Sequence, residues 1–435
     1  MTGSIGGRPR DSHTLTVSLT VLVVLSAALA GCNAVGGGST DAPAGTPSTT
    51  PPADGAETDP VPATDSAADP TTTDSAAADS TTTDEPGDIE QLRAAGVDPN
   101  ATFERVERLL GVDAERPAVR VTEVPLRSET PEDDLQTVLF GEWTYDGETG
   151  VNTARFHQGT GVVFAERAVE NRSAAVLEYT LAHEYVHALQ WNYYGMGSIS
   201  AESAPAFRAF REGSAQWAQF QYVSRYMNVS SERLRRVVRQ GWANRTTRGR
   251  LGAAPYYHGR LWVNRTLDSP ENFSALFEQP PATTEQMLHD TDEEPRSFVT
   301  ATGPDLFDSD WRSGGTVTRG ELWTRVALRD QVNRSTAVTA AEGWGADSMR
   351  VYRDGDGDVG VVWAHRWDST TDADEAERAF RAYAEGRRGE SDEYAFRVVR
   401  VSPETTALVA GSEGFIDGVA VEGTNRSVTV TLADG

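Results

Sequence analysis

Hydrophobic positions between residues 100 and 290 mostly follow helical spacing. Apolar residues recur every three or four positions after Thr102 and then over 166–191, 201–227, 230–241, 258–278 and 283–289. Apolar and polar residues alternate instead over 118–124 and 139–165, which predicts a short strand and then one or two hairpins. Residues 192–200 contain two glycines and are expected to form the turn between two long helices.

The pattern changes after the Asp-, Gly- and Ser-rich stretch 302–316. Strand-like segments follow at 349–353, 360–367, 394–401 and 428–432, with an amphipathic helix over 372–388. The run from Asp354 to Asp358 is expected to be a polar hairpin turn, because the glutamate that completes a calcium loop is absent at the required spacing. The sequence therefore predicts an α+β protein. A mainly helical domain with a small N-terminal β portion spans 89–310, and a small α+β module spans 311–435.

The N-terminus has the features of an export signal. Arg8 and Arg10 precede an apolar run that ends in small residues at Leu29-Ala30-Gly31-Cys32, so residues 1–31 are expected to be a signal peptide. The last four residues resemble the lipobox of lipoproteins, which implies a lipid anchor on Cys32 at the outer face of the cell membrane. The alternative is an uncleaved anchor with a buried cysteine. Cys32 is the only cysteine in the chain, so it has no disulfide partner.

The segment that follows is too polar to fold. Residues 33–88 have no aromatic side chain, 11 acidic residues and no basic ones. Such a composition cannot bury enough apolar area to offset the entropy of ordering the chain. We therefore expect a disordered acidic tether over 32–88.

The negative charge of the chain argues against a nucleic-acid partner and indicates a saline environment. The chain carries 65 acidic and 39 basic residues, a net charge of −26, which argues against binding to nucleic acid. Residues 89–435 alone, with 53 acids against 37 arginines, still carry −16. Every basic residue is arginine, and this acid excess with arginine in place of lysine resembles the proteins of halophilic archaea. A GC-rich genome would explain the arginines but not the charge.

Asparagines provide a second signal for the cell exterior. Eight of the 11 asparagines stand in Asn-X-Ser/Thr sequences, which predicts N-glycosylation of an exposed surface. These eight are Asn100, Asn171, Asn228, Asn244, Asn264, Asn272, Asn333 and Asn425.

The strongest chemical signal is His183-Glu184-Tyr185-Val186-His187, within a predicted helix. Residues four apart lie on one helical face, so both imidazoles can bind one metal ion. A tetrahedral zinc site needs a third protein ligand, and Glu212 on the next predicted helix is the candidate. A glycine-containing turn and an antiparallel return would set Glu212 against the two histidines.

Residues 183–217 resemble the gluzincin metallopeptidases, in which a glutamate on the helix after the HExxH helix completes the zinc site. The resemblance implies a zincin-like fold, one zinc ion per chain, and His183, His187 and Glu212 as its ligands. Weaker similarities at 280–289 and 342–347 to exported predicted peptidases would extend the likeness through most of 89–385. One departure concerns the position four residues after the glutamate, where many gluzincins carry an acidic residue that orients a histidine. It is Gln216 here, and an amide adds less basicity to its partner.

The resemblance and the chemistry together assign roles. Glu184 is expected to act as general base and then as general acid on a zinc-activated water. Tyr256, Tyr257, His258 and His289 are candidates to stabilise the oxyanion, with the two tyrosines ranked first. His157 and His365 have no motif around them and are expected to be structural.

The leading prediction is a membrane-anchored extracellular zinc metallopeptidase that acts on a peptide or protein. The main alternative is a catalytically inactive surface lipoprotein that keeps the fold for a binding or structural role. In a third interpretation, HExxH is a coincidence in a structural surface-layer component. The sequence does not choose between endopeptidase and exopeptidase.

Overall fold

The computed structural model describes residues 84–126, 133–141, 152–199, 201, 203–291, 296, 298–302, 310–390 and 393–432. The predicted signal peptide, Cys32 and residues 32–83 of the predicted tether lie outside this part of the chain. No helix among the described residues is both long enough and apolar enough to cross a membrane.

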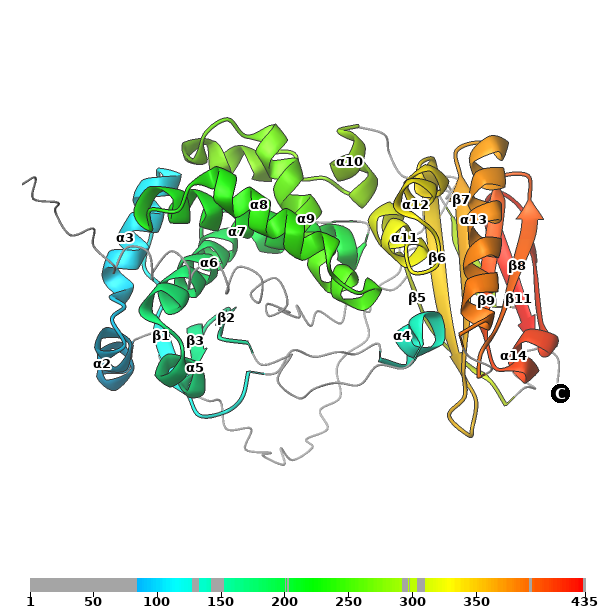
Figure 1. Cartoon of the computed structure of the whole chain (residues 1–435), viewed down its shortest axis with the longest axis horizontal. Coiled ribbons are helices and arrows are strands. Elements are labelled where there is room, and N and C mark those ends of the chain that lie inside the picture. Colours follow the sequence, from blue (N-terminus) through cyan, green and yellow to red (C-terminus); the bar gives the residue numbers. More distant parts are fainter. Residues whose placement is uncertain are drawn as a thin grey trace, which may run out of the picture.

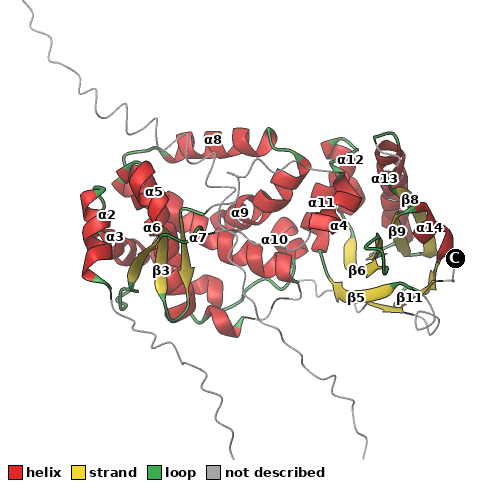
Figure 2. Cartoon of the chain, turned by 90° about the horizontal axis from the view of Figure 1, so that it is seen from below, coloured by secondary structure: helices red, strands yellow, loops and turns green. Residues whose placement is uncertain are grey.

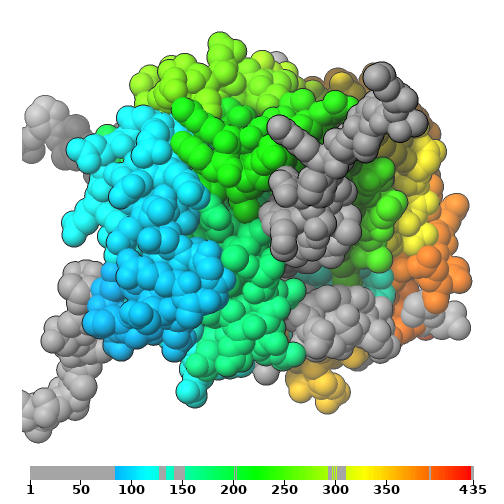
Figure 3. All heavy atoms as spheres, turned by 60° about the vertical axis from the view of Figure 1, so that its left-hand side comes forward, coloured from blue at the N-terminus to red at the C-terminus, as the bar shows by residue number. Residues whose placement is uncertain are grey.

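The folded part begins earlier than expected. Residues 84–88 were assigned to the tether, but Asp84 accepts a hydrogen bond from the backbone N–H of Val119 at 2.8 Å and pairs with Arg116. Helix α2, Pro86–Ala94, follows at once. Helix α3 spans Pro99–Leu110 and starts before Thr102, because the carboxylate of Asp98 caps it. These first helices form one continuous surface with the later helices of the domain (Figure 3).

A small three-stranded sheet follows. β1, Val119–Thr122, runs parallel to β3, Gly161–Ala165, and β2, Ala154–His157, pairs with β3 as a hairpin. The expected hairpin is therefore found at 154–165. The expectation of strands from residue 139 was wrong at its start, because residues 139 and 140 end helix α4, Asp133–Phe140. The apolar residues of α4 pack against the C-terminal sheet.

The rest of the N-terminal region is helical (Figure 1). The helix expected over 166–191 is divided into α5 and α6, and the one expected from 258 begins at Thr247. The elements are α5 Glu166–Asn171, α6 Ala174–Asn192, η1 Met196–Ser198, α7 Ala204–Tyr226, α8 Ser231–Ala243, α9 Thr247–Thr266, η2 Pro270–Phe277 and α10 Thr284–His289.

Two glycines allow α7 and α9 to touch through their backbones. A Cβ atom on Gly213 would lie 2.4 Å from the backbone of Gly259, and one on Gly259 would lie 2.0 Å from the carbonyl oxygen of Ala209. Since no side chain fits at either point, this crossing fixes the position of α7. Gly213 is the residue directly after Glu212.

The C-terminal region has three layers. Its centre is an antiparallel sheet in the order β5-β6-β7-β9-β8, with helices including α13 on one face and a small sheet, β10-β11-β4, on the other. Helix α4 and strand β4, which precede residue 311, belong to this region by their contacts (Figures 1 and 2). The elements are β4 Val299–Thr302, β5 Arg312–Val317, α11 Gly320–Leu328, α12 Arg334–Ala341, β6 Trp344–Arg353, β7 Val359–Trp367, α13 Thr370–Arg388, β8 Ala395–Ser402, β9 Thr405–Gly411, α14 Glu413–Gly418, β10 Val419–Gly423 and β11 Ser427–Leu432.

The four strands and the helix predicted here are present, and the region also contains strands β4, β5, β9 and β10 and helices α4, α11, α12 and α14. The run from Asp354 forms the β6–β7 hairpin turn, as expected, and the Asp354 carboxylate accepts the backbone N–H groups of Asp356 and Asp358 at 3.0 and 2.8 Å. The protein is thus α+β, mainly helical in its N-terminal region and rich in strands in its C-terminal region.

Candidate metal centre

Two antiparallel helices bring together three potential metal ligands. α6 presents His183 and His187 one turn apart, with ring centroids 4.6 Å from each other, and α7 presents Glu212. The Glu212 Oε2 atom lies 3.5 Å from His183 Nε2 and 3.3 Å from His187 Nε2. All three ligand atoms lie within 4.8 Å of one another, and the three residues are at most 4% exposed.

These separations fit a small tetrahedral cation. Zinc bonds of about 2.0–2.1 Å at tetrahedral angles place neighbouring ligand atoms about 3.3 Å apart. Glu212 Oε2 and both Nε2 atoms are buried without a hydrogen-bond partner among the described residues. Buried acceptors that face one another are unfavourable unless a cation lies between them. The donor set, two imidazoles and one carboxylate, suits zinc.

A chain of hydrogen bonds fixes the tautomer of His187. Ser214 Oγ donates to the carbonyl of Phe210 at 2.6 Å and therefore accepts from Gln190 Nε2 at 2.8 Å. Gln190 Nε2 also donates to the carbonyl of Arg211 at 2.8 Å, which leaves Gln190 Oε1 to face His187 Nδ1 at 2.7 Å. The proton of His187 is therefore on Nδ1, and the Nε2 lone pair points to Glu212.

Sequence reasoning missed Gln190 and gave the orienting role to Gln216. Gln216 is buried, and its Oε1 has no hydrogen-bond partner among the described residues. The signal for Gln190 was its position three residues after His187, on the same face of α6.

Arg211 keeps Glu212 ionised. Its guanidinium donates to Glu212 Oε1 from Nε at 3.2 Å and from Nη2 at 2.7 Å, so Oε2 is left for the metal position. Burial alone would raise the pKa of Glu212, but the charge of Arg211 beside it holds that pKa well below its usual value. Arg211 itself is only 4% exposed and was not singled out from the sequence.

Glu184 follows His183 on α6 and is held by the small sheet. Its Oε2 accepts the backbone N–H of Phe156, on edge strand β2, at 2.8 Å. The side chain is 2% exposed. This bond connects the expected general base to strand β2.

The candidates for oxyanion stabilisation separate in space. The ring of Tyr256 lies 6.3 Å from the ring of His183, centroid to centroid. Tyr257 and His258 instead pack against Trp242, at 4.8 and 5.3 Å. His289 lies against α11, where its Nε2 is 3.0 Å from the Glu321 carboxylate, which raises the pKa of His289.

The remaining predicted residues contribute no atom to this group of three ligands. His365 is fully buried between Trp363, Trp367 and Phe380, and burial lowers its pKa to about 3. His157 is exposed at the end of β2. Of the eight sequence positions for N-glycosylation, seven are exposed, and Asn425 is half-buried with its Nδ2 bonded to Glu404.

Comparison with known proteins gives one match. Residues 310–434 match a family model described as "Domain of unknown function (DUF8575)", which covers the C-terminal region. No curated protein and no solved structure matches the chain.

Proposed function

We propose that this chain is an exported zinc metallopeptidase of the gluzincin type. The observation that supports this most directly is the group His183, His187 and Glu212, with Glu184 beside it on the same helix. Bound zinc supplies Lewis-acid polarisation of a peptide carbonyl and lowers the pKa of water. The proposed zincin-like fold is limited to the mainly helical N-terminal region.

Each of the surrounding side chains has a distinct role in this proposal. Glu184 takes a proton from the attacking water and returns it to the leaving amine, while the N–H of Phe156 orients its carboxylate. Tyr256, next to His183, is the best placed of the four candidates to donate a hydrogen bond to the oxyanion. Gln190 and Arg211 hold two of the ligands in position.

The proposed place of action is the outer face of the cell membrane, through a lipid on Cys32. The signal-like N-terminus, the lipobox-like residues before Cys32 and the exposed glycosylation sequences all support it. The acid excess agrees with a saline exterior and a halophilic archaeal source, and with a peptide partner rather than nucleic acid.

The test is hydrolysis of a mixed peptide library in high salt by the whole chain and by Glu184→Gln. Loss of a general base predicts a fall in kcat/KM of about a hundredfold to ten thousandfold. Zinc content measured on the same samples is the control, and it should be unchanged. Hydrolysis that persists unchanged in Glu184→Gln would contradict the proposal.

A second candidate follows from the burial of the ligands. With all three ligands between 0 and 4% exposed, the metal could instead brace α6 against α7 in a catalytically inactive surface lipoprotein. The neutral Gln216 in place of an acidic residue fits this function too. In that case zinc removal lowers the unfolding temperature, but no peptide in the library is cleaved.

A further inference from the structure

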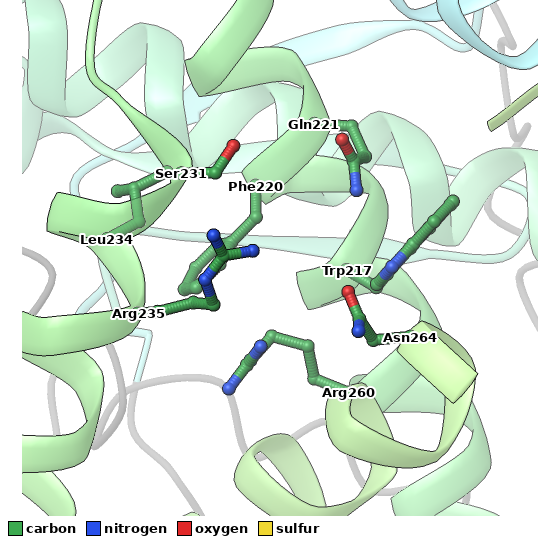
Figure 4. Close-up of a pocket in the computed structure, with 8 residues that line it drawn as sticks. All are labelled: Trp217, Phe220, Gln221, Ser231, Leu234, Arg235, Arg260 and Asn264. Atoms are coloured by element: carbon green, nitrogen blue, oxygen red, sulfur yellow. The ribbon is translucent and has the colours of Figure 1, made fainter. Parts of the chain in front are cut away.

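A polar pocket lies between α7, α8 and α9 and shares no residue with the metal ligands (Figure 4). Arg235 enters it from α8 and Arg260 from α9, and their guanidinium groups lie on the same side of the pocket (Figure 4). Trp217 and Phe220 of α7 provide its aromatic wall. None of the eight lining residues, all within the described part of the chain, is acidic.

Among the residues that the structure describes, no carboxylate forms an ion pair with the buried cation Arg260. The residue is 4% exposed, and its guanidinium carbon lies 5.1 and 5.9 Å from the ring centroids of Phe220 and Tyr257. The Arg260 Nε atom has no hydrogen-bond partner among the described residues. Burial and the nearby charge of Arg235 lower the pKa of Arg260 to about 10, so it is still charged at neutral pH. Leaving such a charge unpaired destabilises the folded protein unless a ligand compensates for it.

The unsatisfied groups in this pocket are donors. The Nε1 atom of Trp217 is also buried without a partner among the described residues, and the side chain is 3% exposed. Arginine and the tryptophan indole can only donate hydrogen bonds. The ligand that satisfies them must therefore offer acceptors and negative charge.

The size of the pocket limits the ligand. Its volume is about 30 Å³, where one water molecule needs about 10–15 Å³. This space admits the anionic head group of a ligand. Two guanidinium groups favour oxygen anions, which they bind through paired N–H···O bonds.

We propose that the pocket lined by Trp217, Arg235 and Arg260 binds an oxyanion, a carboxylate or a phosphate group. The chain as a whole is strongly acidic, so this pocket is a local exception that concentrates positive charge. The site is independent of the metal and of the proposed peptidase activity.

The experiment is a thermal-unfolding titration of the whole chain with sodium phosphate and with sodium acetate. Sodium chloride keeps the ionic strength constant, and a chelator removes any metal bound by His183, His187 and Glu212. We expect a saturable rise in unfolding temperature with at least one oxyanion, and its identity separates phosphate from carboxylate. A rise with neither, or an equal rise with added chloride, would overturn the proposal.

Three variants locate the effect. Arg235→Gln, at the exposed edge of the pocket, should weaken binding at least about tenfold. Arg239→Gln, one turn further along α8 and also exposed, makes the same charge change outside the pocket and should leave binding unchanged. Arg260→Met should abolish binding and, without anion, unfold at the same or a higher temperature than wild type. Equal binding by wild type and Arg235→Gln would refute the assignment.

Discussion

Replacing Gln190 with methionine removes the amide that holds His187 and keeps the side-chain volume nearly constant. Gln190 is fully buried, and its three hydrogen bonds, to His187, Arg211 and Ser214, measure 2.7–2.8 Å. Loss of the partner that orients a metal-binding histidine costs about 10–100-fold in metal affinity, or about 1.4–2.7 kcal/mol. The imidazole N–H left without a partner should also lower the free energy of unfolding by about 1–3 kcal/mol, whereas the Arg211 carbonyl lies inside α7 and keeps its helical partner.

The chain offers a matched control for this variant. Gln216→Met makes the same substitution at another buried position close to the ligands on α7, where the amide oxygen has no partner among the described residues. We expect its zinc affinity, measured by competition with a chromophoric chelator, to change by less than about threefold. If Gln216→Met weakens zinc binding more than Gln190→Met does, the assignment of the orienting residue is wrong.

Three further predictions concern stability. Gly259→Ala should lower the free energy of unfolding in urea by about 1–3 kcal/mol or more, because its Cβ would meet the Ala209 carbonyl. Gly252→Ala, on the same helix, is the control, since a Cβ there would enter open space. Equal effects of the two substitutions would contradict the close crossing. Asp347→Asn should lower the free energy of unfolding by about 3 kcal/mol in the same assay, because the buried carboxylate accepts hydrogen bonds from four N–H groups. An unchanged urea midpoint would refute this prediction. His365 has a pKa lowered to about 3, so its contribution is present above pH 6.5 and is lost as the pH falls toward 3. Metal-free wild type should therefore lose about 2 kcal/mol more than His365→Phe between pH 7.5 and 5, and parallel profiles would contradict the burial argument.

Sequence pattern predicted the elements that have long apolar runs or apolar residues at helical spacing. β6 and β7 were found because their apolar residues form runs bounded by turns, and α13 because its buried residues recur at helical spacing. Strand β9, Thr405–Gly411, lies in the middle of its sheet with both faces covered, like β7, but it was missed because Leu408 and Val409 are its only large apolar residues. All seven of its residues are buried, so its sequence shows no alternation.

Strand β5 was missed for a different reason. All six residues of Arg312–Val317 are exposed, and the strand is held by backbone pairing with β6 and by hydrogen bonds from Arg350 to Ser313 and Thr316. Helix α4 shows a third case, because its burial depends on the C-terminal sheet, far away in sequence. The local pattern of apolar residues reveals neither the pairing of β5 with β6 nor the distant sheet that buries α4.

The candidate site was predictable where chemistry depends on spacing within a helix. His183, Glu184 and His187 follow from a four-residue interval, and Glu212 from the expected antiparallel return. Gln190 and Arg211 could not be ranked in the same way, because their roles depend on side-chain directions between α6 and α7. The two donors of the α7–α8–α9 pocket have no motif at all, and only their burial without partners indicates them.

Metal stoichiometry tests the central proposal most directly. Zinc would be measured on the whole chain purified in high salt, alongside His187→Ala, Glu212→Gln and Glu184→Gln. We expect about one zinc per chain in the wild type and in Glu184→Gln, and loss of tightly bound zinc in the two ligand variants. Well-folded wild type without bound metal, or equal zinc content in Glu212→Gln, would contradict the assignment of this site.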